Sequence, residues 1–194
     1  MEQIWDAIII GGGPAGSSVA RYAAKGGAKV LVIDSRKTIG TPLQCGELVP
    51  TNEELVKLCP DVPDIDELFT IPEKAISKRT STMGLVTPSG KKLIYPFQGK
   101  ILERPIHDLA LVDLAKKEGA EYLTKAKVTN VEKEQVTLSN GDTVKGKIIV
   151  GCGGPHDPVR GKYWDEESLN IFVKFMLIEG EFEDRVDLYF GSTA

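Results

Sequence analysis

Long basic runs and long apolar runs are both missing from this chain of 194 residues. Its 24 Lys and Arg residues are outnumbered by 28 Asp and Glu residues, which gives a formal net charge of −4. An acidic chain lacks the positive surface that binds nucleic-acid backbones, so we set aside a nucleic-acid partner. The longest apolar stretch, residues 171–178, contains Lys174 and is shorter than the roughly 20 residues that cross a bilayer. The sequence therefore predicts no membrane-spanning helix.

Cysteine is also scarce, and this bears on where the protein works. Cys45, Cys59 and Cys152 are an odd number of cysteines, lie far apart in the sequence and lack the spacing of metal ligands. They predict no metal site and favour a reducing cytoplasm. The acidic N-terminus leads directly into a predicted strand and does not resemble a signal peptide. The remaining composition, 41% hydrophobic and 27% charged, is typical of a globular protein.

The front of the chain has the pattern of one parallel βαβ unit. Residues 7–10 form an apolar run that ends at a glycine-rich turn, residues 11–16. Residues 17–25 predict a helix with small residues along one face, and a second apolar run, residues 30–33, is closed by Asp34. A strand, a glycine turn, a helix and a strand in this order predict parallel strands joined by a right-handed crossover.

The rest of the chain completes an α/β fold with a second layer. We expect a parallel sheet with helices on one face and a meander on the other, and a separate antiparallel layer. The stretch 38–73 is rich in proline and predicts a loop with one short helix near 52–58. The next predicted elements are a hairpin over 77–95, a helix over 105–118 and a parallel strand over 121–123. A meander over 127–150 follows, which turns at Asn140-Gly141 and ends in a buried strand over 148–150. Residues 170–178 and 185–190 predict antiparallel strands of a different sheet.

The strongest chemical signal is the motif Gly11-x-Gly13-x-x-Gly16, placed directly after a strand and directly before a helix. Gly11 permits a tight turn, Gly13 lets the backbone approach a pyrophosphate, and Gly16 lets the helix pack closely on the strand. The helix amino terminus offers N–H groups and a positive dipole end to the phosphates. The alternative is a glycine-rich turn that binds nothing, but the flanking elements agree with a dinucleotide site.

Asp34 stands at the end of the second predicted strand, where a carboxylate accepts hydrogen bonds from both ribose hydroxyls of an adenosine. A carboxylate there repels a 2′-phosphate, so FAD or NAD is favoured over NADP. The alternative for Asp34 is an exposed aspartate in a turn. For Arg36, stacking on adenine, pairing with phosphate and simple solvation all remain open.

Together with Gly40-x-Pro42 and the run Leu43-Gln44-Cys45-Gly46-Glu47, these motifs resemble the archaeal geranylgeranyl reductase family, flavoproteins related to p-hydroxybenzoate hydroxylase. The Cys-Gly-Glu element is the most specific to that family. Further similar stretches are Leu102-Glu103-Arg104-Pro105 before a helix, residues 125–132, and Tyr189-Phe190-Gly191. The resemblance spans the whole chain but covers only the front half of such a protein.

The resemblance implies a Rossmann-like FAD/NAD(P)-binding fold of the p-hydroxybenzoate hydroxylase type, with part of an antiparallel substrate-domain sheet. It implies an FAD-binding domain over 1–60 and 100–162, and a partial substrate domain over 61–99 and 163–194. Cys45 becomes a candidate for flavin or substrate contact and for catalysis, against the alternative of a small packed thiol. Glu47 is a weaker catalytic candidate, as a proton relay or a structural residue. The residues expected to bind the cofactor are Gly11, Gly13, Pro14, Ala15, Gly16, Asp34, Ser35, Arg36, Cys45, Gly46, Arg104, Val128 and Gly153.

One stretch departs from the family pattern. Related flavoproteins usually carry Ala-Asp-Gly after the last strand of the sheet, where the aspartate supports contacts to the flavin. This chain has Cys152-Gly153-Gly154 there, and the nearest carboxylate, Asp157, comes four residues after Gly153. Either another group supplies the contact or the flavin is held more weakly.

The function that the resemblance implies is FAD-dependent reduction of prenyl (geranylgeranyl) double bonds in archaeal membrane lipids. It implies a prenylated lipid substrate, a ferredoxin-type electron donor and peripheral contact of a cytoplasmic protein with the membrane. Two alternatives stay open: an NAD-dependent dehydrogenase built on the same βαβ unit, and a nucleotide-binding fragment that is inactive alone. The dehydrogenase leaves Cys45-Gly46-Glu47 and Arg104 without a role.

Overall fold

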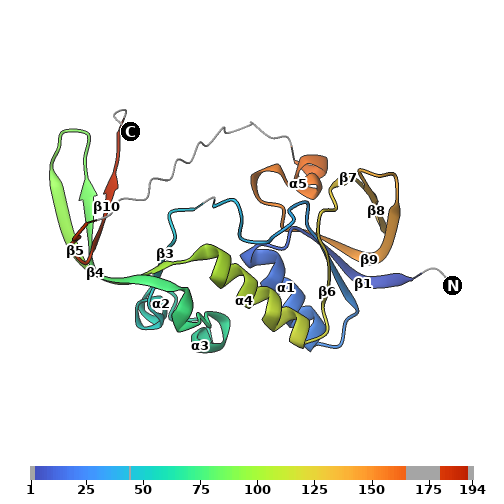
Figure 1. Cartoon of the computed structure of the whole chain (residues 1–194), viewed down its shortest axis with the longest axis horizontal. Helices are drawn as coiled ribbons and strands as arrows, with labels where there is room; N and C mark the ends of the chain where they lie inside the picture. The colour runs from blue at the N-terminus through green and yellow to red at the C-terminus, as the bar shows by residue number, and fades with distance from the viewer. Residues whose placement is uncertain (1–2, 44, 165–179, 192–194) are drawn as a thin grey trace. The chain divides into compact units, whose positions relative to one another are not determined.

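The computed structural model describes residues 3–43, 45–164 and 180–191 (Figure 1). The chain divides into two compact units, each built from two separate stretches. Met1–Leu43 and Asp108–Phe172 form the first unit, and Gln44–His107 and Val173–Ala194 form the second. The predicted domains also alternate along the chain, but residues 44–60 and 100–107, which were predicted to belong to the FAD-binding domain, fall in the second unit. The strand at residues 48–50 pairs with a strand of that unit's sheet. The functions assigned to these domains stay predictions.

The first unit is built on a sheet of six strands in the order β6-β2-β1-β9-β8-β7. Its centre is parallel, because β1 pairs in parallel with both β2 and β9, and β2 with β6. The meander β7-β8-β9 is antiparallel and extends the sheet on one side. The strands are β1 (Ile4–Ile10), β2 (Val30–Ile33), β6 (Glu121–Leu123), β7 (Val128–Val131), β8 (Gln135–Leu138) and β9 (Thr143–Gly151).

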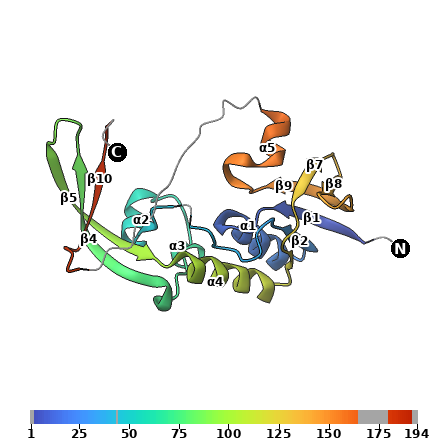
Figure 2. The same cartoon turned by 45° about the horizontal axis from the view of Figure 1, so that its top comes forward.

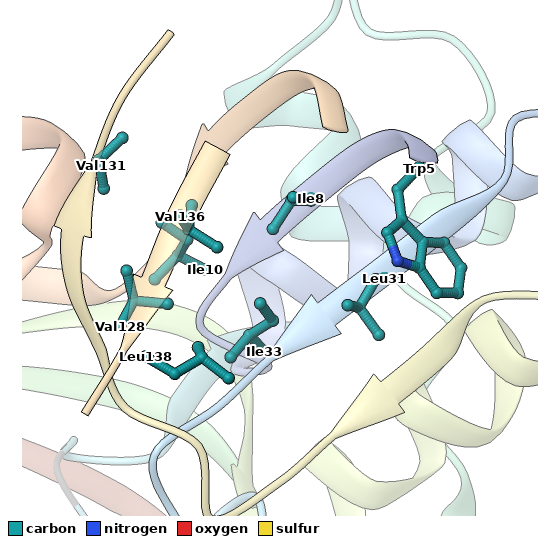
Figure 3. Packing of buried hydrophobic residues seen from close by; sticks show 9 residues of the cluster. All are labelled: Trp5, Ile8, Ile10, Leu31, Ile33, Val128, Val131, Val136 and Leu138. Carbon is teal, nitrogen blue, oxygen red and sulfur yellow. The ribbon is translucent and has the colours of Figure 1, made fainter. Parts of the chain in front are cut away.

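Both faces of β1 and β2 are covered, which explains their nearly continuous apolar sequences. On one face, α1 (Pro14–Lys25) and α4 (Arg104–Lys117) lie beside each other and supply small residues to the core (Figures 1 and 2). Ala20, Ala24 and Ala115 pack there on Ala7 and Ile9. The opposite face packs on the meander, in a cluster (Figure 3) that consists of Trp5, Ile8, Ile10, Leu31, Ile33, Val128, Val131, Val136 and Leu138.

This arrangement confirms the predicted parallel sheet with helices on one face and a meander on the other. One detail of the prediction was wrong. Residues 148–150 form part of a strand, but the side chain of Ile148 is 61% exposed. The buried residues of α1 and α4 pack on β1 and β2, and Ile148 does not belong to that core cluster.

The second unit carries a sheet of four strands in the order β10-β4-β5-β3. The predicted hairpin is present and longer than expected: β4 (Ile76–Val86) and β5 (Lys92–Leu102) pair antiparallel, and β3 (Leu48–Pro50) joins β5 in the same way. However, β10 (Arg185–Tyr189) runs parallel to β4, so the antiparallel pairing predicted for 185–190 was wrong.

Residues of three strands meet around Asp187 of β10. Asp187 lies opposite Gly84, which has no side chain to obstruct it, and Asp187 reaches across to Lys92 on β5 at 2.5 Å. The other strand predicted for this sheet, 170–178, lies outside the described residues.

The short helices follow local signals in the sequence. The predicted helix at 52–58 is α2 (Asn52–Leu58), which begins after Thr51, whose hydroxyl accepts a hydrogen bond from the Glu54 N–H. The stretch 38–73 holds more structure than predicted, since β3 and a further helix, α3 (Ile65–Leu68), also form there. The remaining helical turns are η1 (Glu73–Ala75), η2 (Gly154–His156) and α5 (Pro158–Tyr163). None of the described helices is both long and apolar enough to cross a membrane.

Candidate functional site

The glycine turn between β1 and α1 is shaped by two very close backbone contacts. Gly11 has φ +99°, and a Cβ added there would lie 2.4 Å from the carbonyl oxygen of Cys152, the residue directly after β9. A Cβ at Gly16 would lie 1.8 Å from the carbonyl oxygen of Gly11. Glycine is therefore required at both positions for the turn to fold back between the two strands and the helix.

Gly13 differs because space lies beside it. A Cβ at Gly13 would meet only the Arg36 Nη2 atom, at 3.8 Å. Gly13 is the N-cap of α1, Pro14 fills the first turn, and no side chain caps the helix. The N–H groups of Ala15 and Gly16 lie in the first turn, where an α-helix has no carbonyl to accept them. The turn thus combines an open backbone with N–H donors, which fits a diphosphate.

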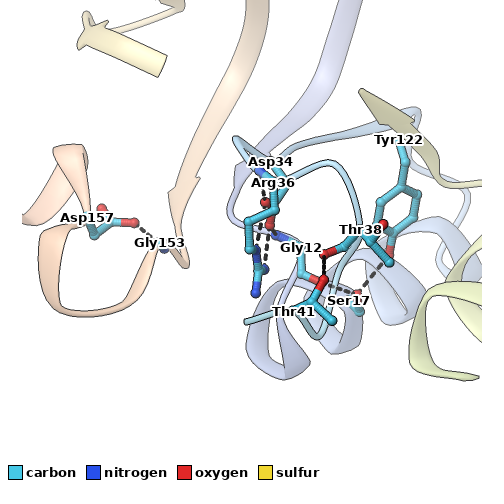
Figure 4. A network of polar contacts seen from close by, with 9 residues as sticks. All are labelled: Gly12, Ser17, Asp34, Arg36, Thr38, Thr41, Tyr122, Gly153 and Asp157. Carbon is cyan, nitrogen blue, oxygen red and sulfur yellow. Dashed lines mark hydrogen bonds and ion pairs between the residues drawn. The ribbon is translucent and has the colours of Figure 1, made fainter. Parts of the chain in front are cut away.

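Asp34 follows β2 directly and its side chain is only 4% exposed. Its carboxylate accepts hydrogen bonds from the Gly12 N–H at 2.7 Å and the Arg36 N–H at 2.8 Å. The Arg36 guanidinium adds two more, from Nε at 2.9 Å and Nη2 at 2.6 Å (Figure 4). Burial raises the pKa of Asp34, but the hydrogen bonds from Arg36 and Gly12 outweigh it and lower the pKa below 3.8. Asp34 is a buried, charged anchor of the glycine turn.

The other side of the turn is held by residues that the sequence analysis did not single out. The Ser17 hydroxyl, fully buried in α1, donates to the Gly12 carbonyl at 3.0 Å, and the Tyr122 hydroxyl on β6 donates to Ser17 Oγ at 3.0 Å (Figure 4). Burial raises the pKa of Tyr122, although the bond to Ser17 opposes this. The small residues along the buried face of α1 were the available signal for Ser17; nothing in the sequence linked Tyr122 to it.

The stretch after β9, where the chain departs from the family pattern, is held together by Asp157. Asp157 is buried and caps α5 by accepting from the N–H groups of Val159 and Arg160. It also accepts from the Gly153 N–H at 2.5 Å. The carboxylate thus serves the local fold, and it occupies the N–H of Gly153, a residue that the resemblance assigns to the cofactor. Burial, with the charge of Asp157, raises the pKa of Cys152.

Two further predicted residues lie close to Asp34 in sequence or in space. Ser35 is exposed. The segment that leads into β7 runs beside the end of β2, since the Ala126 N–H donates to the Asp34 carbonyl and the Lys125 N–H to that of Arg36. This brings the segment predicted to meet adenine next to the acid predicted to bind ribose, while the Val128 side chain points into the core.

The remaining predicted residues belong to the second unit, where they are described by themselves. Cys45 and Gly46 are exposed, and Glu47 is half-buried with φ 67°. Burial and the charge of Glu103 raise the pKa of Glu47, while Arg104, at the start of α4, opposes this. The charge of Arg104 therefore acts on Glu47. Cofactor binding by Cys45, Gly46 and Arg104 stays a prediction, and so does a catalytic role for Cys45 or Glu47.

Comparisons with known proteins identify a family whose match includes these residues. The model of the FAD dependent oxidoreductase family matches residues 6–157, which contain the glycine turn, Asp34 and Asp157. An uncharacterized protein in the nifH2 5′ region of Methanosarcina barkeri is 34% identical over 161 residues, covering 81% of this chain and 87% of that protein. Digeranylgeranylglycerophospholipid reductase 1 of Methanosphaera stadtmanae is 35% identical over 204 residues, covering 96% of this chain and 48% of its own.

A solved structure is also similar to this chain. A geranylgeranyl bacteriochlorophyll reductase-like protein of Thermoplasma acidophilum is 28% identical with a TM-score of 0.60, over 78% of this chain and 40% of its own. This chain therefore spans about half, or less, of the length of the reductases it matches. The predicted resemblance and fold class are confirmed, and FAD rather than NAD is the cofactor of the matching family. This chain belongs to the FAD-dependent oxidoreductase family.

Proposed function

We propose that this chain binds FAD through the glycine turn and Asp34, and that it serves the reduction of prenyl double bonds in archaeal membrane lipids. The observation that carries the first part is the open backbone at Gly13, with first-turn N–H donors on one side and the buried Asp34 on the other. The second part is supported by the archaeal reductases that cover this chain.

Each residue of the turn has a distinct part in this proposal. The N–H groups of Ala15 and Gly16 and the helix dipole hold the diphosphate. Asp34 receives the ribose hydroxyls, and the segment before β7 borders the adenine. Gly12 is fixed between Asp34 and Ser17, so the donors are in place before the ligand arrives. Bound flavin supplies the hydride; the protein supplies position and exclusion of water.

Protonation of the second alkene carbon requires an acid, and we propose Glu47 or Cys45 for it. The raised pKa of Glu47 favours its protonated form; burial raises this pKa most, the charge of Glu103 adds to the increase, and the charge of Arg104 opposes it. Cys45 is exposed and its thiol is the alternative donor. Glu47→Gln and Cys45→Ser, tested separately, distinguish them: the variant that loses turnover while keeping bound FAD identifies the donor.

The test uses the chain loaded with FAD, reduced with dithionite and supplied with a digeranylgeranylglycerophospholipid. Mass spectrometry of the lipid follows the gain of two hydrogens for each saturated bond. Saturation supports prenyl reduction, and replacing dithionite with reduced ferredoxin then tests the proposed donor. A chain that binds FAD and saturates no bond supports the alternative of a nucleotide-binding module that is inactive alone. Co-sedimentation with vesicles of archaeal lipid tests the proposed peripheral membrane contact.

A further inference from the structure

The hydroxyl of Tyr122, on β6, is connected to the glycine turn by a chain of two hydrogen bonds (Figure 4). A serine hydroxyl has one proton to donate, and that of Ser17 goes to the Gly12 carbonyl at 3.0 Å. The Ser17 oxygen therefore accepts, and the Tyr122 hydroxyl donates to it at 3.0 Å. Ser17 is fully buried, and in a buried chain each hydrogen bond strengthens the next. Tyr122 thus acts on Gly12 through Ser17.

Gly12 is held on both sides of its α-carbon. Its N–H donates to Asp34 at 2.7 Å, and its carbonyl accepts from Ser17. Glycine has more backbone freedom than any other residue, so without these bonds the two peptide planes that meet at Gly12 rotate at little cost. The pair of hydrogen bonds fixes both planes.

The direction of the Gly12 carbonyl decides where the next N–H points. The peptide bond between Gly12 and Gly13 is trans, so its carbonyl and the Gly13 N–H lie on opposite sides of it. Because the carbonyl points to Ser17, the Gly13 N–H points away from Ser17. No residue that the structure describes accepts a hydrogen bond from this N–H, and a Cβ added at Gly13 would meet only the Arg36 Nη2 atom, at 3.8 Å. The turn therefore holds an open donor in a fixed direction.

We propose that Tyr122 is a positioning residue of the nucleotide site: through Ser17, its hydroxyl directs the Gly13 N–H at the diphosphate of the ligand. This inference rests on the proposed function, in which the same turn binds the diphosphate of FAD. It adds one backbone donor to those in the first turn of α1. It also adds a residue that lies 105 positions from Ser17 in the sequence and outside the glycine motif.

The ring and the hydroxyl of Tyr122 have separate parts. The ring packs against the core cluster that includes Ala20 and Ala24 of α1, whereas the hydroxyl donates to Ser17. Tyr122→Phe keeps the packing and removes the hydrogen bond. Tyr22→Phe is the matched control, because the buried Tyr22 hydroxyl, also on α1, has no hydrogen-bond partner in the part of the chain that the structure describes.

The test measures the affinities of FAD, ADP and adenosine for the wild-type chain, Tyr122→Phe and Tyr22→Phe, by flavin fluorescence for FAD and by calorimetry for the other two. In Tyr122→Phe, we expect FAD and ADP to bind about fivefold more weakly, because the Gly13 donor is no longer held in place. Adenosine has no diphosphate and should bind as it does to the wild type. Tyr22→Phe should leave all three affinities unchanged. An equal loss for adenosine, or no loss for FAD and ADP, overturns the positioning role.

A double-mutant cycle with Ser17→Ala tests the route of this effect. If Tyr122 acts through Ser17, Tyr122→Phe has no further effect on FAD affinity in the Ser17→Ala background. A loss of the same size in both backgrounds shows that Tyr122 acts by another route and overturns the proposal. If Ser17→Ala fails to fold, the comparison of Tyr122→Phe with Tyr22→Phe decides alone. Failure of the folded wild-type chain to bind FAD and ADP overturns the proposed function, and the positioning role with it.

Discussion

Gly13 and Gly16 belong to one motif, but an added methyl group would have different effects at the two positions. At Gly16 the methyl would collide with the backbone of Gly11, whereas at Gly13 it would find space. Gly16 is therefore required by the fold, whereas our proposal assigns Gly13 to the ligand. The sequence motif groups them, and only the structure separates their roles.

Gly13→Ala and Gly16→Ala test this separation. We expect Gly16→Ala to lower the free energy of unfolding by about 2 kcal/mol or more, because backbone must shift. Gly13→Ala should unfold like the wild type and bind FAD about tenfold more weakly, because the methyl obstructs the approach of the diphosphate. Urea unfolding and FAD titration measure the two effects. Gly26→Ala, whose Cβ meets only ordinary contacts, is the control for both. Equal FAD affinity of wild type and Gly13→Ala would contradict the assigned role.

Asp34 gives a prediction of pH dependence. Its pKa is lower in the folded chain than the usual 3.8, so the folded state binds its proton less readily than the unfolded state does. The stabilisation is complete above the unfolded pKa and is lost as the pH falls through the folded pKa. We expect the unfolding free energy of the wild type to fall more steeply below about pH 4 than that of Asp34→Asn. Parallel curves for the two proteins would show that Asp34 is not held as a stabilised anion.

The site residues that could be predicted from the sequence differ physically from those that could not. Gly11, Gly16 and Asp34 were found because a turn and a strand end place them by local sequence alone. Ser17 and Tyr122 were missed because their hydrogen bond joins α1 to β6 and depends on the packing of the sheet. Contacts of this kind arise from tertiary structure, which no local pattern encodes.

At the scale of elements, Asp157 connects the residues that follow β9 to the first turn of α5 by hydrogen bonds. One carboxylate accepts from Gly153, Val159 and Arg160. In the sequence, Asp157 comes four residues after the position where related flavoproteins carry an aspartate. In the structure, it caps a helix. The chain thus has a local structural reason for a carboxylate at this position.

Asp157→Ala is expected to lower the free energy of unfolding by about 1 kcal/mol, because the first turn of α5 loses its cap. Asp157→Asn keeps a side-chain acceptor and should cost about half as much. Urea unfolding followed by circular dichroism compares the two variants with the wild type. If Asp157→Ala left stability unchanged and lowered FAD affinity instead, the carboxylate would be a cofactor residue and the structural assignment would be overturned.

The direction in which a strand runs beside its neighbour is a second feature that the sequence pattern does not predict. Residues 121–123 and 185–190 both have the pattern of a strand, and the first was correctly predicted to be parallel. The second was predicted to be antiparallel, but β10 pairs in parallel with β4, a strand that is distant in the sequence. Periodicity predicts that a strand forms and does not identify its neighbour.

At the scale of the whole molecule, the two units have separate sheets, and the proposed ligand contacts of the glycine turn, Asp34 and the 125–128 segment all lie in the first. Ligand that binds only the folded state protects the backbone it contacts. We expect FAD to slow amide hydrogen exchange at residues 11–16, 34–36 and 125–128. The hairpin of β4 and β5 is the internal reference, and protection confined to that hairpin would contradict the placement of the site.

Identification of the nucleotide that the purified chain carries or takes up tests the central claim most directly. The chain is incubated with equimolar FAD and NAD, freed of unbound ligand and denatured, and the released nucleotide is identified by chromatography and absorbance. We predict FAD in equimolar amount to the wild-type chain and much less from Gly13→Ala. Release of NAD, or of no nucleotide from a folded wild-type chain, would contradict the account.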